Sequence, residues 1–496
     1  MRRRLLAMLT VPLLLSMMWG VAWAQGPVGP QDLPGSGWVT GSQVQNVGTG
    51  DAVIQMCVYG QTGGEWCLDG TGVPPESSVN FLGTSFGWPD GSIGSAIVSS
   101  GQPIVAQTTE TNGTAAAQYQ GVDQLDTQVS FPLVKNDYKG GGKFTTFFVQ
   151  NAGSSAAVIY ATYTAEDGTQ YSWNSGSAVE PGRMVVLNPT DVSFPTDQLG
   201  SLLVTSTVSI AGVVNEHHVT EAIYLQATRG FAPADAGTTL LIPTIKRQFG
   251  NRSTGPIIQN ASGGPVDIYI TYKGTGIDFV QYAQNVPDSA SVTFFENAEV
   301  CPAGATCGRT GTPLPAGTLA SAVVTATGDI VGVVNETFYT IPAGQNQRQT
   351  ATSAFNQAAA TTKIAVPLYK VNHDYKNSGI QLQNTNLATT AHFTATFSLG
   401  GSGGVPVTKY VLIGPIDPGQ SMTLFKLYAA LPPACSWVGP GFPSPWSTSS
   451  TSAERFGSVT IVADQPIVAA VTEADDDPTV GDRQDIKSYE AFNLTP

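Results

Sequence analysis

A short phrase that returns along the chain is the feature that most constrains its fold. Residues 210–219 read IAGVVNEHHV, and residues 330–339 read IVGVVNETFY. Two looser copies, PIVAQTTE and PIVAAVTE, complete the set, and the glutamates that end the four copies are Glu110, Glu216, Glu336 and Glu473. A phrase used four times predicts a repeated building block rather than one catalytic box.

Other landmarks recur in the same order around each copy of the phrase. Before it come an apolar-Gln-Asn step, a proline turn and a small-Ser step, and after it comes an aromatic residue with a polar neighbour. The asparagines of the apolar-Gln-Asn step are Asn46, Asn151, Asn260 and Asn384. This fixed order predicts four units, at residues 38–126, 127–236, 237–360 and 361–496.

Each unit has the sequence pattern of an all-β domain. Val, Ile, Tyr and Phe recur in short runs between turn residues, as in β-strands, and Ile210, Gly212 and Glu216 would share one face of such a strand. The pair Asp167-Gly168 is a good two-residue hairpin turn. A unit of about 90–135 residues exceeds the period of a solenoid repeat and suits a β-sandwich. We therefore expect four tandem immunoglobulin-like β-sandwiches in an elongated array.

The first residues have the pattern of an export signal. Residues 2–4 are arginines, a short apolar stretch follows, and Ala22-Trp23-Ala24 offers a small-residue cleavage site before Gln25. A membrane anchor is the alternative, but polar sequence follows the apolar stretch at once. We expect a signal peptide at 1–24, a flexible leader at 25–37, and a secreted or cell-surface protein.

The charge of the chain restricts its partners. Without the signal, 19 basic residues face 36 acidic residues, which gives a net charge of −17. This acidity disfavours nucleic acid and anionic membranes. No later segment has about 18 unbroken apolar residues, so we expect no membrane span in the mature chain.

Four of the five cysteines are placed to form disulfides, which export permits. Cys57 and Cys67 flank a TGG turn, and Cys301 and Cys307 close a very short loop. Each bridge would add on the order of 2–3 kcal/mol in the loop-entropy model. The second pair also has a spacing found in metal knuckles, but no further pair or nearby His completes a zinc site. Cys435 is left over, either as a buried thiol or as a link between two chains.

The repeated glutamate is predicted to be scaffold rather than catalyst. It ends a strand and could accept hydrogen bonds from a turn near the asparagine of the apolar-Gln-Asn step. Acid–base hydrolysis usually needs two carboxylates, and each unit offers one. The G-x-S-x-G matches at 83–87 and 400–404 lack a strand-to-helix elbow, and Glu216-His217-His218 lacks the helical spacing of a metal motif. We expect no catalytic residue, with a hydrolase as the residual alternative.

Unit one departs from the other three. Units two to four open with a Pro-apolar strand at 131–134, 242–245 and 366–369, whereas unit one has only Leu33-Pro34, too close to Asn46 for the same strand. One interpretation is a slightly smaller domain with a disordered leader. The other is an open sheet edge that accepts a strand from another copy, which would give end-to-end assembly.

Binding residues are expected in the longest variable loop, residues 426–456. Its aromatic candidates are Tyr428, Trp437, Phe442 and Trp446. If exposed, they could stack on sugar rings or pack on a protein. If folded back, they would form a lid over their own domain.

The acidic segment 473–482 contains a weak candidate for a calcium site. Its carboxylates Asp475, Asp476 and Asp477 are the oxygen ligands that calcium prefers, although the spacing is not that of an EF-hand. A solvated acidic loop is the alternative. No other cofactor is expected.

With its Pro-apolar strand, apolar-Gln-Asn step, proline turn and IVxVVNE strand, the unit resembles repeats in secreted multidomain proteins of environmental bacteria. The resemblance implies an exported, surface-associated β-sandwich protein and carries no known active site. The expected function is a structural or adhesive role at the cell surface, with itself, surface glycans or surface proteins as partners. The alternative is an array of carbohydrate- or protein-binding modules that uses the 426–456 loop.

Overall fold

The structure is a computed structural model. It describes residues 37–112, 115–218, 224–274, 276–338, 349–400, 406–443, 446, 451–475 and 486–494. The predicted signal peptide and residues 25–36 of the leader lie outside this part of the chain.

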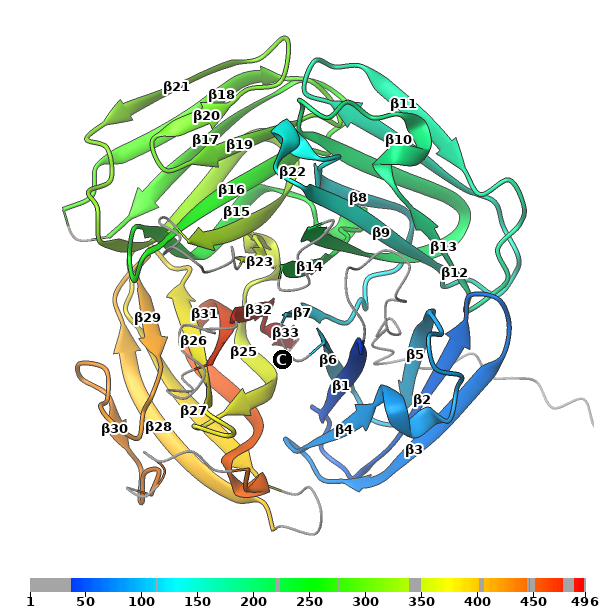
Figure 1. Cartoon of the computed structure of the whole chain (residues 1–496). Helices are drawn as coiled ribbons and strands as arrows, with labels where there is room; N and C mark the ends of the chain where they lie inside the picture. Colours follow the sequence, from blue (N-terminus) through cyan, green and yellow to red (C-terminus); the bar gives the residue numbers. More distant parts are fainter. Residues whose placement is uncertain are drawn as a thin grey trace, which may run out of the picture.

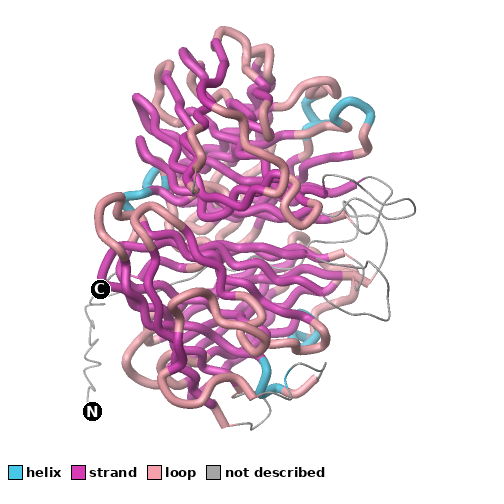
Figure 2. Tube along the Cα trace, turned by 90° about the vertical axis from the view of Figure 1, so that its left-hand side faces the viewer, coloured by secondary structure: helices cyan, strands magenta, loops and turns pink. Residues whose placement is uncertain are grey.

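The described chain consists of β-strands joined by turns and short 3-10 helices, as Figure 2 shows. The prediction of an all-β protein is confirmed, and the paired sheets fit β-sandwiches. The 3-10 helices are η1 (Gly83–Phe86), η2 (Tyr138–Gly140), η3 (Pro189–Val192), η4 (Pro233–Asp235), η5 (Gln357–Ala359) and η8 (Ala453–Arg455). Within these residues, none of the helices has the length and apolar character that a bilayer crossing requires.

In unit two, one long strand serves two sheets. The strands are β8 (Asp126–Val134), β9 (Lys143–Asn151), β10 (Ile159–Ala165), β11 (Gln170–Asn174), β12 (Met184–Leu187), β13 (Gly200–His218) and β14 (Leu225–Arg229). The first half of β13 pairs with β8 and β10, and its second half pairs with β9 and β14. We call the sheet that contains β10 the outer sheet and the sheet that contains β14 the inner sheet. The predicted turn at Asp167-Gly168 joins β10 to β11.

Unit three repeats this arrangement around β22 (Thr318–Phe338). Its other strands are β15 (Gly237–Arg247), β16 (Arg252–Asn260), β17 (Val266–Lys273), β18 (Phe279–Val286), β19 (Ser291–Phe295), β20 (Ala298–Val300), β21 (Thr306–Gly311), β23 (Gln349–Ser353) and β24 (Phe355–Asn356).

Unit four repeats it around β31 (Phe456–Asp475). Its other strands are β25 (Thr361–Lys370), β26 (Lys376–Asn384), β27 (Ala391–Leu399), β28 (Thr408–Ile416), β29 (Ser421–Leu424), β30 (Ser436–Trp437), β32 (Ile486–Glu490) and β33 (Phe492–Leu494).

In unit one the long strand is divided in two, and each part belongs to one sheet. The strands are β1 (Val39–Asn46), β2 (Ala52–Gly60), β3 (Glu65–Val73), β4 (Ser78–Leu82), β5 (Gly94–Ser100), β6 (Ile104–Thr111) and β7 (Ala116–Gln120). The outer sheet has the order β3-β2-β5, and the inner sheet has the order β4-β1-β6-β7. Among the described strands, none takes the place that β8 has beside β13, so β5 pairs with β2 alone.

The four units form a closed ring, so the prediction of an elongated array is wrong. Figure 1 shows them in chain order around a centre, where β7 contacts β14 and β32, and β23 contacts the same two strands. Units four and one meet directly: Lys409 Nζ lies 2.7 Å from Glu76 Oε2, and Gln45 Nε2 donates to Thr460 Oγ1 over 3.3 Å. Sequence periodicity predicts the number of units but carries no information on the angle between neighbours, and that angle decides between a rod and a ring.

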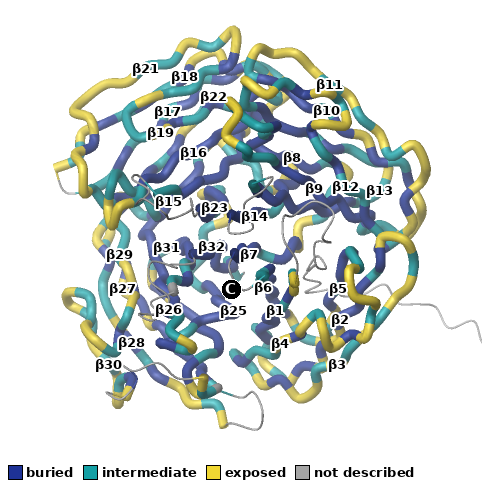
Figure 3. Tube along the Cα trace, in the orientation of Figure 1, coloured by how far each residue is buried: buried dark blue, intermediate teal, exposed yellow. Residues whose placement is uncertain are grey.

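Buried apolar side chains fill each unit and also the contacts between units. Each unit has a core of its own between its two sheets. Smaller clusters join neighbouring units, such as Leu133 of unit two with Ile257 and Val333 of unit three. Figure 3 shows exposed residues mainly around the outside of the ring. The ring is therefore held by apolar contacts at the places where two units meet, which we call seams.

Candidate functional site at the seams

The four repeated glutamates are buried, and two of them, Glu110 and Glu216, accept hydrogen bonds across a seam. Three of them are paired with a lysine from the opening strand of their own unit. Lys135 Nζ lies 2.6 Å from Glu216, Lys246 Nζ lies 2.8 Å from Glu336, and Lys370 Nζ lies 2.8 Å from Glu473.

These lysines were missed by the sequence analysis, although a signal was present. Each lysine stands three residues after the proline of the opening strand, in a Pro-x-x-Lys pattern that recurs in units two, three and four.

Second donors hold each of these three carboxylates. Tyr224 Oη donates to Glu216 over 2.5 Å, Arg252 Nη1 lies 3.2 Å from Glu336, and Lys487 Nζ lies 3.0 Å from Glu473. Burial alone would raise the pKa of these carboxyls, but the adjacent cations outweigh it and lower the pKa of all three. The glutamates are therefore charged members of buried ion pairs.

The asparagine of the VVNE phrase links two units. Asn215 Nδ2 of unit two donates to Glu110 of unit one over 2.9 Å, and Asn335 Nδ2 of unit three donates to Glu216 of unit two over 3.3 Å. The corresponding residues are Thr472 in unit four and Thr109 in unit one. Three of the four carboxylates are thus joined to their own unit by a lysine, and at two seams an asparagine of the next unit donates to the carboxylate.

Glu110 differs from the other three, because unit one has no described opening strand to supply a lysine. Its described partners are the Tyr119 hydroxyl at 3.3 Å and the Asn215 amide. Burial raises the pKa of Glu110 to about 7, and these hydrogen bonds only partly offset the effect.

The asparagines of the apolar-Gln-Asn step do not lie against these glutamates, contrary to expectation. Asn46 Nδ2 instead donates to the carbonyls of Gly50 and Val73 over 2.8 Å each, and its Oδ1 accepts from the Gly48 amide at 2.9 Å. The same pattern of bonds recurs at Asn151, Asn260 and Asn384. Each asparagine therefore shapes the turn that follows its own strand.

A cleft of about 440 Å³ opens at the seam between units four and one. Strands β1, β4 and β6 of unit one form its floor with polar side chains, among them Gln43, Asn80 and Gln107. Unit four supplies the opposite wall, which includes His373 and Phe456. The rings of these two residues lie 4.7 Å apart.

The aromatic residues of the 426–456 loop pack on unit four. Phe442 is 8% exposed and Trp446 is 6% exposed, and both belong to the core cluster of the unit. Tyr428 and Trp437 are partly buried against the same cluster. The loop thus lies as a lid over its own domain, the second of the two interpretations of this segment.

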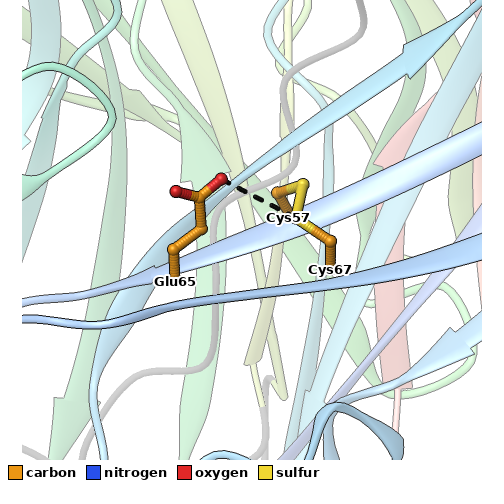
Figure 4. A group of neighbouring side chains, drawn as sticks. All are labelled: Cys57, Glu65 and Cys67. Carbon is orange, nitrogen blue, oxygen red and sulfur yellow. Dashed lines mark hydrogen bonds between the residues drawn. A yellow bond between two sulfur atoms is a disulfide. The ribbon is translucent and has the colours of Figure 1, made fainter.

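Both expected disulfides are present, Cys57–Cys67 and Cys301–Cys307. Glu65 lies beside the first bridge, with Oε1 3.7 Å from Cys67 Sγ (Figure 4). Because both sulfurs are bonded to each other, this group is a bridged hairpin rather than a metal centre. Cys435 is a partly buried free thiol whose Sγ lies 3.5 Å from Met422 Sδ.

Among the described residues, the remaining candidates lie apart from any catalytic arrangement, and residues 401–404 of the second G-x-S-x-G match lie outside this part of the chain. Residues 83–86 form the 3-10 helix η1 after β4, so Ser85 is not on a nucleophile elbow. His217 is buried, lies 3.0 Å from Thr146 Oγ1 and has its pKa lowered to about 4 by burial. The calcium candidates Asp476 and Asp477 lie outside the described residues, as does the Asp475 side chain.

No family model matches the chain, and no curated protein matches it by sequence. Among solved structures, the chain is compared with a tetra-tandem repeat in the extending region of a large adhesion protein. The two share 11% identity over 96% of this chain and all of the other, with a TM-score of 0.09. Such a score carries no argument about fold or function.

Proposed function

We propose that the chain is an exported, non-enzymatic protein with a structural or adhesive role at the cell surface, built from four immunoglobulin-like sandwiches closed into a ring. The observation that carries this proposal is the use of the repeated glutamates. Their partners are lysine and asparagine side chains that join strands and units, and this chemistry serves the scaffold. The two disulfides and the sequence of the first 24 residues support export.

Surface labelling of the producing cells tests this role. An antibody raised against residues 37–496 should label intact cells, and the mature chain should begin near Gln25. Light scattering and electron microscopy of the purified chain, with and without calcium, then test self-assembly. Labelling only after lysis, with residues 1–24 retained, would contradict the surface role.

Binding of a carbohydrate or protein is the second candidate function. The cleft between units four and one favours it, because a hollow of this size in which a few polar groups lie among apolar ones is typical of small-ligand sites. Apart from Phe456, the lining of this cleft lies outside the 426–456 loop, whose aromatic candidates pack on their own unit.

A further inference from the structure

We propose that the cleft between units four and one is a binding site for a neutral saccharide, held by a row of three amide side chains. The inference rests on the second candidate function and names its site and ligand class. It is independent of the structural role of the ring.

The amide row crosses three neighbouring strands of the inner sheet of unit one. Gln43 on β1 lies opposite Asn80 on β4 and opposite Gln107 on β6. Residues opposite one another in a sheet point to the same face, and all three line the cleft. Together they offer amide donors and carbonyl acceptors along one line.

Unit two has apolar residues at the same register positions. Phe148 lies opposite Val186 and Val213 there. In unit three the corresponding row is Ile257, Thr293 and Val333. An apolar row suits a packed seam, as where Leu133 meets Ile257 and Val333. Unit four has one amide at these positions, where Gln381 lies opposite Thr423 and Ala470. The three amides of unit one therefore make its face the most strongly hydrogen-bonding of the four.

One amide of the row is incompletely paired. The Gln107 side chain is fully buried, and its Nε2 donates to Thr109 Oγ1 over 2.9 Å. Within the described part of the chain, its Oε1 has no donor. Leaving a buried acceptor without a donor costs about 1–3 kcal/mol. Because Gln107 has no exposed surface, a ligand hydroxyl in the cleft supplies the missing donor only when this side chain rotates toward the cleft.

One side chain beside the cleft differs between the units. In units three and four a phenylalanine covers the inner-sheet glycine: a Cβ added at Gly255 would meet the Phe295 ring at 2.9 Å, and one at Gly379 would meet the Phe425 ring at 3.1 Å. The residue opposite Gly41 in unit one is Leu82. A Cβ at Gly41 would meet the Leu82 side chain at 3.5 Å, so the leucine covers this glycine less closely than the two rings cover theirs.

The opposite wall favours a ligand without net charge. The charged side chains there are paired, Lys370 with Glu473 at 2.8 Å and Lys376 with Asp374 at 3.7 Å. Phe456 and His373 add a ring surface for the C–H face of a sugar. Hydroxyl groups, which both donate and accept, match the amide row on the other side.

Saturation-transfer NMR on residues 25–496 tests the site, with maltose, cellobiose and N,N′-diacetylchitobiose as probes. At least one probe should receive saturation from the wild-type protein, and the same probe should raise the melting temperature of the protein. Gln107→Val introduces the valine that units two and three have at this position. Leu82→Phe introduces the phenylalanine that covers the equivalent glycine in units three and four. We expect each variant to weaken binding of that probe about tenfold or more. Without ligand, the melting temperature of each variant should equal or exceed that of the wild type.

The control is Leu387→Ala, an exposed position on unit four away from the cleft lining, which should bind as the wild type does. Absence of transfer to all three probes would overturn the proposal. Transfer that is unchanged in both cleft variants would place binding elsewhere and also overturn it. Preference for glucuronic acid over the neutral probes would exclude a neutral ligand. Failure of surface labelling would contradict the structural role and leave these readouts unaffected.

Discussion

At the scale of single residues, Glu110 makes the stability of the protein depend on pH. Its carboxyl has an ordinary pKa of 4.5 when unfolded and a pKa of about 7 when folded. Between these values the folded chain holds a proton on Glu110 that the unfolded chain lacks, so the contribution of this group to stability is highest below pH 4.5 and decreases as the pH rises to 7. We expect a loss from this group on the order of 3 kcal/mol, and Glu110→Gln should remove it. Urea unfolding of both proteins at several pH values measures the effect.

The matched control is Glu336→Gln, because Glu336 occupies the same place in unit three. Lys246 and Arg252 hold this carboxylate, so its loss leaves buried cations without a partner. We expect a destabilisation of about 3–5 kcal/mol at pH 8, where Glu110→Gln stabilises. Equal effects of the two substitutions would contradict the difference between the seams.

The sequence predicts the position of these glutamates but not their partners. The repeated phrase places Glu216 near a strand end, and the four copies are the ground on which a scaffold role is expected for it. The partner Lys135 lies 81 positions earlier, and the contact depends on the pairing of β8 with β13. Asn335 belongs to the next unit, so its bond to Glu216 depends on the angle at the seam. Local sequence patterns predict neither the pairing of distant strands nor the angle between two units.

At the scale of elements, the 426–456 loop is part of the core of unit four. The Trp446 ring packs 5.5 Å from Phe442 and 5.6 Å from Tyr410, measured between ring centroids. We expect Trp446→Ala to lower the free energy of unfolding by about 3–5 kcal/mol. Thermal unfolding measures this, and Leu387→Ala, at a 62% exposed side chain, should change little. A stable Trp446→Ala protein would mean that the loop contributes no packing energy.

A disulfide bridge joins the two strands of the β2–β3 hairpin. Cys57 and Cys67 lie opposite each other in register, and β3 is at the edge of an outer sheet with three described strands. We expect the double substitution to Ala to cost about 2–3 kcal/mol, through the wider freedom of the unfolded chain. Urea midpoints measure this, and Cys435→Ala, which breaks no bridge, should cost less.

At the scale of the whole molecule, ring closure makes the protein compact. For the 472 residues that follow the predicted signal, a compact chain has a radius of gyration of about 23 Å. Four sandwiches in a row would give a much larger value. Small-angle scattering of the purified chain should give a value near the compact one. Reversing one contact between units four and one, with Lys409→Glu, should leave the radius unchanged, because exposed ion pairs contribute little.

The closed ring also limits how such a protein can change in length. A linear array accepts another copy at either end, and its last copies need caps to shield their open faces. In the ring every unit already has two neighbours, so none of the four is terminal. A fifth unit would require a new angle between neighbours at every seam at once. Loss of one unit would expose the seam faces of its two neighbours to solvent. Duplication of a unit therefore conflicts with ring closure, and a new binding surface arises more readily by substitution on a face of one of the four existing units.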